Sequence, residues 1–67
     1  MSWSTSASGT AAEVKDVVNK EQQCPDVVKQ AIASLVDACP VEAKITLSTY
    51  GHHNSDKIAN VVIIIAT

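Results

Sequence analysis

The chain has 67 residues, 46% of them hydrophobic, so it is long enough for one small domain (residues 1–67) and too apolar to be disordered over most of its length. The net charge is −2 and all five cations are lysines, which disfavours nucleic acid and anionic membranes as partners, because both are bound through basic patches. No segment reads as a signal peptide or is apolar enough to span a bilayer. These features predict a cytoplasmic protein.

Residues 1–8 alternate between two kinds of side chain. Trp3, Thr5 and Ala7 fall on one side, and the serines at positions 2, 4, 6 and 8 fall on the other. Such a period of two predicts a strand with Trp3 on its buried face, and Gly9 ends the pattern. The alternative is a frayed, serine-rich tail, which is common at chain ends.

A helix is predicted to begin at Thr10. Thr10 and Glu13 have the spacing of a capping box, in which each side chain bonds the backbone N–H of the other residue. The apolar residues that follow recur at helical spacing: Val14, Val17 and Val18. Asp16 and Lys20 add an ion pair one turn apart, and the helix is expected to fade in residues 21–23.

The second predicted helix begins with Pro25 at its first position, where the missing N–H has no cost, and with Asp26 at the positive end of the dipole. Its apolar face consists of five residues: Val28, Ala31, Ile32, Leu35 and Val36. Pro40 ends it, because a residue that precedes proline is disfavoured in the helical conformation.

Two strands are predicted in the C-terminal part. Residues 41–50 alternate between apolar and polar, as in a strand with one wet face, and residues 50–56 have the composition of a turn. The last strand, residues 58–66, is apolar on both faces over positions 61–66.

The predicted fold class is therefore α+β, in the order strand-helix-helix-strand-strand, with a three-stranded sheet and both helices on one face. We expect the last strand in the centre of that sheet, because a strand that is apolar on both faces must be covered on both.

Cys24 and Cys39 flank the second predicted helix. Fifteen residues of helix at ~1.5 Å per residue hold them about 22 Å apart, whereas a disulfide needs Cα atoms within about 7 Å. Both thiols are therefore predicted to be free in the monomer. Bridging between two chains is the alternative.

His52, His53 and Asp56 are the only sequence cluster that resembles a set of metal ligands. Neighbouring side chains of an extended segment point in opposite directions, so a polar turn explains the cluster better.

The chain also lacks a nucleophile elbow and a glycine-rich phosphate loop. We expect no catalytic residue, no metal and no cofactor, and thus no enzyme.

The candidate interaction site is the apolar run Val61, Val62, Ile63, Ile64 and Ile65. Two helices cover only one face of the sheet, so one alternate set of this run is left on the other face: either 61, 63 and 65 or 62, 64 and 66. Monomers rarely expose such a row unless it is an interface. The run predicts a homo-oligomer or a protein partner that covers it.

Two families resemble this chain. The segment Ser2–Thr10, the helix start at Glu13-Val14 and the segment Ser48–His52 before an apolar strand are together similar to small proteins of tailed bacteriophages. That resemblance implies a product of the virion-structural region, such as a minor virion or capsid-decorating subunit located in the host cytoplasm and the virion.

The chain also resembles the dodecins, which are flavin-binding dodecamers of similar length. The resemblance lies in Gly51-His52 and in Lys57-Ile58-Ala59 before the last strand. The chain departs from that family in three ways. It has two predicted helices instead of one, Trp3 is not at the position of the flavin-stacking tryptophan, and Val62 takes the place of a flavin-contacting glutamine.

Two functions of different classes follow. The first is a non-enzymatic structural subunit, most simply of a phage particle, that acts through contacts with itself or with capsid proteins. The alternative is a small binding module, either a dodecin-like ligand carrier or a phage-encoded inhibitor of a host protein.

Overall fold

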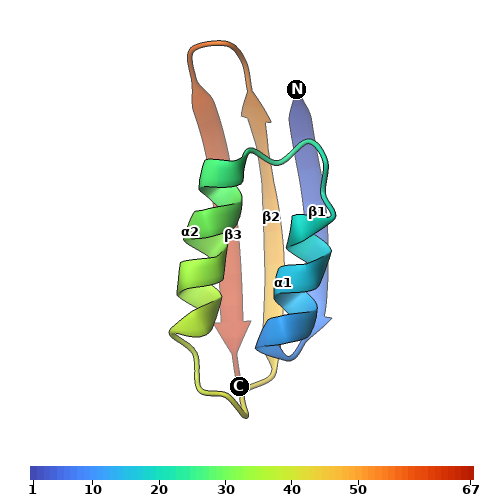
Figure 1. Cartoon of the computed structure of the whole chain (residues 1–67), viewed down its shortest axis with the longest axis vertical. Coiled ribbons are helices and arrows are strands. Elements are labelled where there is room, and N and C mark those ends of the chain that lie inside the picture. The colour runs from blue at the N-terminus through green and yellow to red at the C-terminus, as the bar shows by residue number, and fades with distance from the viewer.

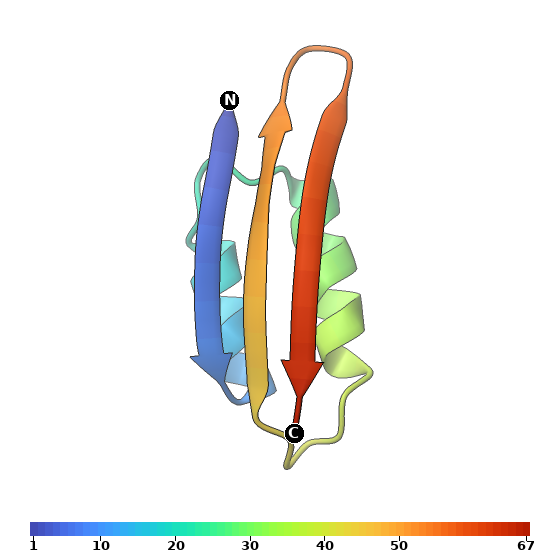
Figure 2. The same ribbon diagram turned by 180° about the vertical axis from the view of Figure 1, so that it is seen from behind.

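Three strands and two helices make up the chain in the computed structural model, which describes residues 1–67 (Figure 1). Their order is β1 (Ser2–Gly9), α1 (Ala11–Asn19), α2 (Asp26–Asp37), β2 (Ile45–His53) and β3 (Ile58–Ala66). Both helices lie on the same face of the sheet, α1 on the β1 side and α2 on the β3 side (Figures 1 and 2). The predicted fold class and element order are confirmed, and the N-terminal segment is a strand, not a tail.

The sheet is antiparallel throughout, in the order β1-β2-β3 (Figure 2). The prediction that the last strand lies in the centre is therefore wrong: β2 is central and β3 is an edge strand. With these strand directions, β1 beside β3 would form a parallel pair, which is less stable per residue than an antiparallel one. Antiparallel pairing of β1 with β2 leaves β3 only one neighbour.

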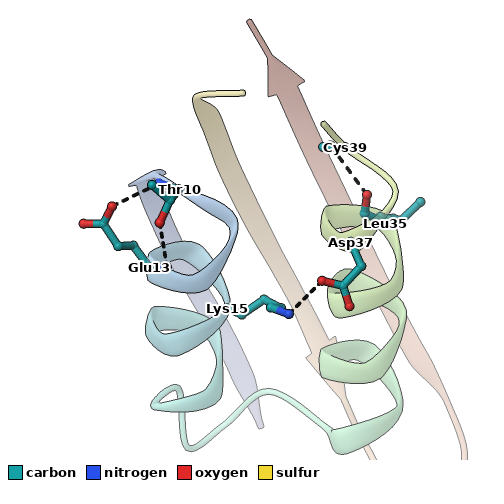
Figure 3. A network of polar contacts seen from close by, with 6 residues as sticks. All are labelled: Thr10, Glu13, Lys15, Leu35, Asp37 and Cys39. Carbon is teal, nitrogen blue, oxygen red and sulfur yellow. Dashed lines mark hydrogen bonds and ion pairs between the residues drawn. The ribbon is translucent and has the colours of Figure 1, made fainter. Parts of the chain in front are cut away.

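The N-terminus of α1 carries the predicted capping box (Figure 3). The Glu13 N–H donates to Thr10 Oγ1 at 3.3 Å, and the Thr10 N–H donates to Glu13 Oε1 at 3.1 Å. The predicted ion pair between Asp16 and Lys20 is also present, at 3.0 Å. In α2, Pro25 is the N-cap and not the first helical residue as predicted, because its ψ of 149° is extended.

Two boundaries in the C-terminal half differ from the prediction. β2 begins at Ile45 and not at position 41, because a hydrogen bond from the Ala43 N–H to the Pro40 carbonyl closes a turn, which leaves Val41 90% exposed. β2 also continues to His53, well into the predicted turn. The turn itself is tighter: Asn54 Oδ1 accepts from the N–H groups of residues 56 and 57.

The core lies between the helices and the sheet. It contains nine buried residues from four of the five elements and the segment between the helices: Trp3, Val14, Val18, Cys24, Val28, Ile32, Val36, Ile45 and Leu47. Three residues predicted for the apolar helix faces are instead exposed: Ala31, Val17 at 38% and Leu35 at 52%. Each lies on a helix flank that no other element covers.

Candidate interaction surface

The face of the sheet opposite the helices, hereafter the open face, is covered by nothing. Cross-strand partners share a face, and Trp3, Gly51 and Asn60 are in register on the helix side. The open face therefore consists of the alternate residues of each strand. They are Ser2, Ser4, Ser6 and Ser8 of β1, then Thr46, Ser48, Tyr50 and His52 of β2, then Ala59, Val61, Ile63 and Ile65 of β3.

Polarity changes steadily across this open face. The β1 column is entirely serine, the β2 column is mixed, and the β3 column is apolar. Val61, Ile63 and Ile65 are 40%, 49% and 56% exposed. Tyr50, which pairs with Val61 in the register, is 50% exposed and extends the apolar area towards β2. We call Tyr50, Val61, Ile63 and Ile65 the open-face patch.

The structure thus divides the predicted run of five residues into two sets. Val62 and Ile64 are half-buried and pack against the core under the helices. Val61, Ile63 and Ile65 do not contact that core and belong to the open-face patch. Of the two alternate sets that the sequence allowed, the odd-numbered one is left uncovered.

A second apolar surface lies on the flank of α2. Lys15 Nζ pairs with Asp37 Oδ1 at 2.7 Å (Figure 3). Lys29 Nζ donates to the Asn19 carbonyl at 3.2 Å. These two contacts mark the flank of α2 that faces α1. The opposite flank holds Val27, Ala31 and Leu35, because a helix turns ~100° per residue. Figure 3 shows the Leu35 side chain pointing away from α1. This flank lies on the β3 side of the molecule.

Between these two apolar surfaces runs the free backbone edge of β3. Lys44 and Thr67 exchange both backbone hydrogen bonds, each at 2.9 Å, which fixes the alternation of the β2–β3 ladder. Odd-numbered residues of β3 therefore bond to β2. The N–H and C=O groups of the even-numbered residues 58, 60, 62, 64 and 66 point away from the sheet, along an edge that has no neighbouring strand.

A buried polar link fixes the middle of the sheet. Trp3 Nε1 donates to Thr49 Oγ1 at 3.4 Å, and the same hydroxyl donates to the Val61 carbonyl at 3.0 Å. Thr49 is fully buried, so both of its hydrogen bonds are made out of water. One side chain from each of β1 and β2 thus ties to the backbone of β3, which holds the open-face patch at a fixed position.

Gly51 makes room for the tryptophan. A Cβ at this position would lie 2.5 Å from Trp3 Cζ2 and 2.5 Å from the Ala59 carbonyl oxygen. The indole therefore lies across the glycine, and Trp3 is only 4% exposed. A shallow pocket of about 440 Å³ lies nearby at the hairpin end of the sheet, lined by Trp3, Tyr50, Gly51, His52, Ala59, Asn60 and Val61. It contains no acidic residue and no lysine.

The residues that resembled metal ligands are dispersed. His52 and His53 are consecutive residues of β2, so their side chains lie on opposite faces of the sheet, and Asp56 lies in the turn beyond. No group of three or more histidine, cysteine, aspartate or glutamate side chains is close enough to hold a metal ion.

No helix of the protein has both the length and the apolar character needed to cross a membrane.

Both thiols are free, as predicted for the monomer, and α2 separates them. Cys24 belongs to the core, where burial raises the pKa of its thiol, while nearby Lys29 opposes that shift. Cys39 is partly exposed, and its Sγ donates to the Leu35 carbonyl at 3.6 Å (Figure 3). A buried thiol that is shifted towards its neutral form is a poor nucleophile.

Comparison with models of protein families, with curated proteins and with solved structures finds no significant match to this chain.

The sequence does not single out Tyr50 and Leu35 as contact residues. Its alternation over residues 41–50 puts Tyr50 on the wet face of the predicted strand with Thr46 and Ser48, but Tyr50 also opens the predicted turn, and the structure extends β2 beyond it. Leu35 falls in the predicted core face of its helix, whereas in the structure it is exposed. No sequence signal shows which flank of α2 has a neighbour, because that depends on the position of α1.

Proposed function

We propose that this protein is a non-enzymatic interaction protein that acts through protein–protein contacts made on its β3 side. The observation that carries the proposal is the exposed row Val61, Ile63 and Ile65. Added together, the exposed fractions of these three residues correspond to about one and a half fully exposed side chains. Complete burial of that surface would stabilise a complex by about 2–4 kcal/mol per copy. That is a large fraction of the stability expected for so small a domain.

Contacts with protein are favoured over a small-ligand site by the state of Trp3. Its indole is buried against Gly51 and its N–H is bonded to Thr49, so neither ring face is free to stack on a flavin or a similar ring.

The resemblance to tailed-phage proteins extends the proposal to a structural subunit of a phage particle, found in the host cytoplasm and in the virion. Mass spectrometry of purified virions tests that extension, and an absorbance spectrum tests the dodecin-like alternative.

The interaction itself is tested by sedimentation over a range of micromolar concentrations. We expect the wild-type protein to sediment above its monomer mass of 7.1 kDa. The double variant Ile63→Thr/Ile65→Thr keeps strand-forming side chains but removes apolar area, so it should shift towards the monomer. A matched control, Ser4→Thr/Ser6→Thr, alters the opposite side of the open face and should sediment like the wild type. A wild-type protein that stays a soluble monomer throughout contradicts the proposal.

A further inference from the structure

The free edge of β3 differs from the other edge of the sheet in its chemistry. Edge strands normally carry lysine, proline or a bulge that prevents pairing with another chain. Residues 58–66 form a regular nine-residue strand with no charge, no proline and no glycine. At the opposite edge, the outward-facing side chains of β1 on the open face are serines. The β3 edge is thus the one at which pairing would also bring apolar side chains of two chains into contact.

We infer that two copies of this chain pair antiparallel along β3, across a two-fold axis, into one continuous six-stranded sheet; this inference rests on the proposed function and names its partner. In the register that overlaps all nine residues, Val62 lies opposite its own copy. Asn60 then lies opposite Ile64, and Ile58 opposite Ala66. These are the residues whose N–H and C=O groups have no partner in the monomer, so every free edge group finds a complement.

Side chains on both faces fit this pairing. On the open face, Val61 lies beside Ile63 of the second copy, so the two apolar columns contact each other side by side. This contact covers the edge-facing sides of these residues, whereas the outer surface of the joined patch still faces solvent. On the helix face, the α2 flank with Val27 and Leu35 meets the same flank of the second copy. The charged residues Asp37 and Lys29 lie on the other flank, towards α1, and do not enter the contact.

The extents of the molecule, 38 Å along its longest axis and 15 Å along its shortest, outline a rectangle of about 570 Å² on the β3 side, or about 1,100 Å² for two copies. A specific interface needs at least about 1,000 Å², so the contact has to include the α2 flank as well as the strand edge. A two-fold contact repeats one surface on both subunits and then closes. The edges that remain are the two serine-rich β1 strands, so further growth of the sheet buries little apolar surface.

Amide hydrogen exchange of the wild-type protein tests the pairing directly. In the monomer, N–H groups of odd-numbered residues in β3 are protected by β2, while those of Asn60, Val62 and Ile64 are open to solvent. Edge pairing predicts that these even-numbered amides become protected as the protein concentration rises through the association range. An oligomer whose even-numbered amides still exchange freely overturns the edge pairing but leaves the proposed function standing. A monomer at every concentration overturns both.

A proline variant provides an independent test. Asn60→Pro removes an N–H that has no partner within the chain, so the variant should fold with an unchanged circular dichroism spectrum, whereas its dimer loses two hydrogen bonds and should dissociate about tenfold or more readily. The matched control is Ser4→Pro, which removes an outward-facing N–H from the β1 edge. It should leave dimerisation unchanged. A Ser4→Pro variant that dissociates while Asn60→Pro does not would move the contact to β1 and overturn the inference.

Discussion

Replacing Gly51 with alanine sets two effects of opposite sign against each other. Glycine in a strand is less stable than alanine by about 0.5–1 kcal/mol, so backbone preference alone predicts that Gly51→Ala stabilises the protein. The packing predicts the reverse. The new Cβ would lie 2.5 and 2.6 Å from two carbons of the Trp3 ring and 2.5 Å from the Ala59 carbonyl oxygen. Either the indole or the backbone of β3 must move.

The indole cannot move without loss, because its N–H bonds to the buried Thr49 hydroxyl. Overpacking of this kind costs about 1–3 kcal/mol, and the carbonyl contact places Gly51→Ala towards the upper end of that range. After the backbone gain, we expect a net loss of about 1–2 kcal/mol. In a domain of this size, each kcal/mol lost from the free energy of unfolding lowers the melting temperature by about 4–8 °C. We therefore expect the melting temperature to fall by about 5–15 °C.

Urea unfolding followed by fluorescence measures this loss well, because Trp3 is the only tryptophan in the chain. Wild type and variant are compared at one protein concentration, since association shifts apparent stability. Ser48→Ala on the same strand serves as the control and should change little. In a Trp3→Leu background, followed by circular dichroism, Gly51→Ala should cost less. A Gly51→Ala variant as stable as the wild type, or more stable, would refute the argument that the ring needs the glycine.

Three further changes test single interactions. Thr49→Val leaves the Trp3 N–H buried without an acceptor and should cost about 1–3 kcal/mol in urea unfolding, whereas Thr49→Ser keeps the hydroxyl and should cost less. Hydrogen bonds with the backbone N–H and the side chain of Thr10 hold the pKa of Glu13 below its ordinary value of 4.5. The stability that these bonds contribute is therefore complete above pH 4.5 and is lost as the pH falls through the folded-state pKa. In Glu13→Gln the urea midpoint should change less over that range. A thiol reagent should find two thiols in denaturant without reductant, and in the native protein it should modify Cys39 before Cys24, an order that Cys39→Ser checks by removing the fast phase.

Local signals predicted the elements of this fold well. The capping box at Thr10 and Glu13 depends only on residues three apart, and the alternation in residues 1–8 depends only on neighbours, so both could be read without knowledge of the rest of the chain. The predicted end of a strand was wrong where that end depends on pairing with another strand. β2 extends to His53 because that residue bonds to Met1 on one side and pairs with Ile58 on the other.

The strand order could not be derived from hydrophobicity alone. The most apolar strand must be central only if all of its side chains are buried by the chain's own sheet and helices. In the structure, the pairing of Trp3 with Gly51 fixes β1 next to β2, and that pairing depends on a close contact between two residues far apart in the sequence. The resulting order leaves β3 at the edge, where only its even-numbered side chains are covered.

The odd-numbered side chains of β3 are not required by the fold. Val61, Ile63 and Ile65 do not belong to the core or pack against it, whereas their neighbours Val62 and Ile64 do. Threonine or serine at these three positions would match the open face of β1 and would leave the core unchanged. Exposed isoleucine and valine beside an unprotected strand edge carry a risk of aggregation that β1 avoids with its serines. Residues that bring this risk without contributing to the core are best explained by a contact that buries them, and the contact must lie on the β3 side, because that is where both the apolar column and the free backbone groups occur.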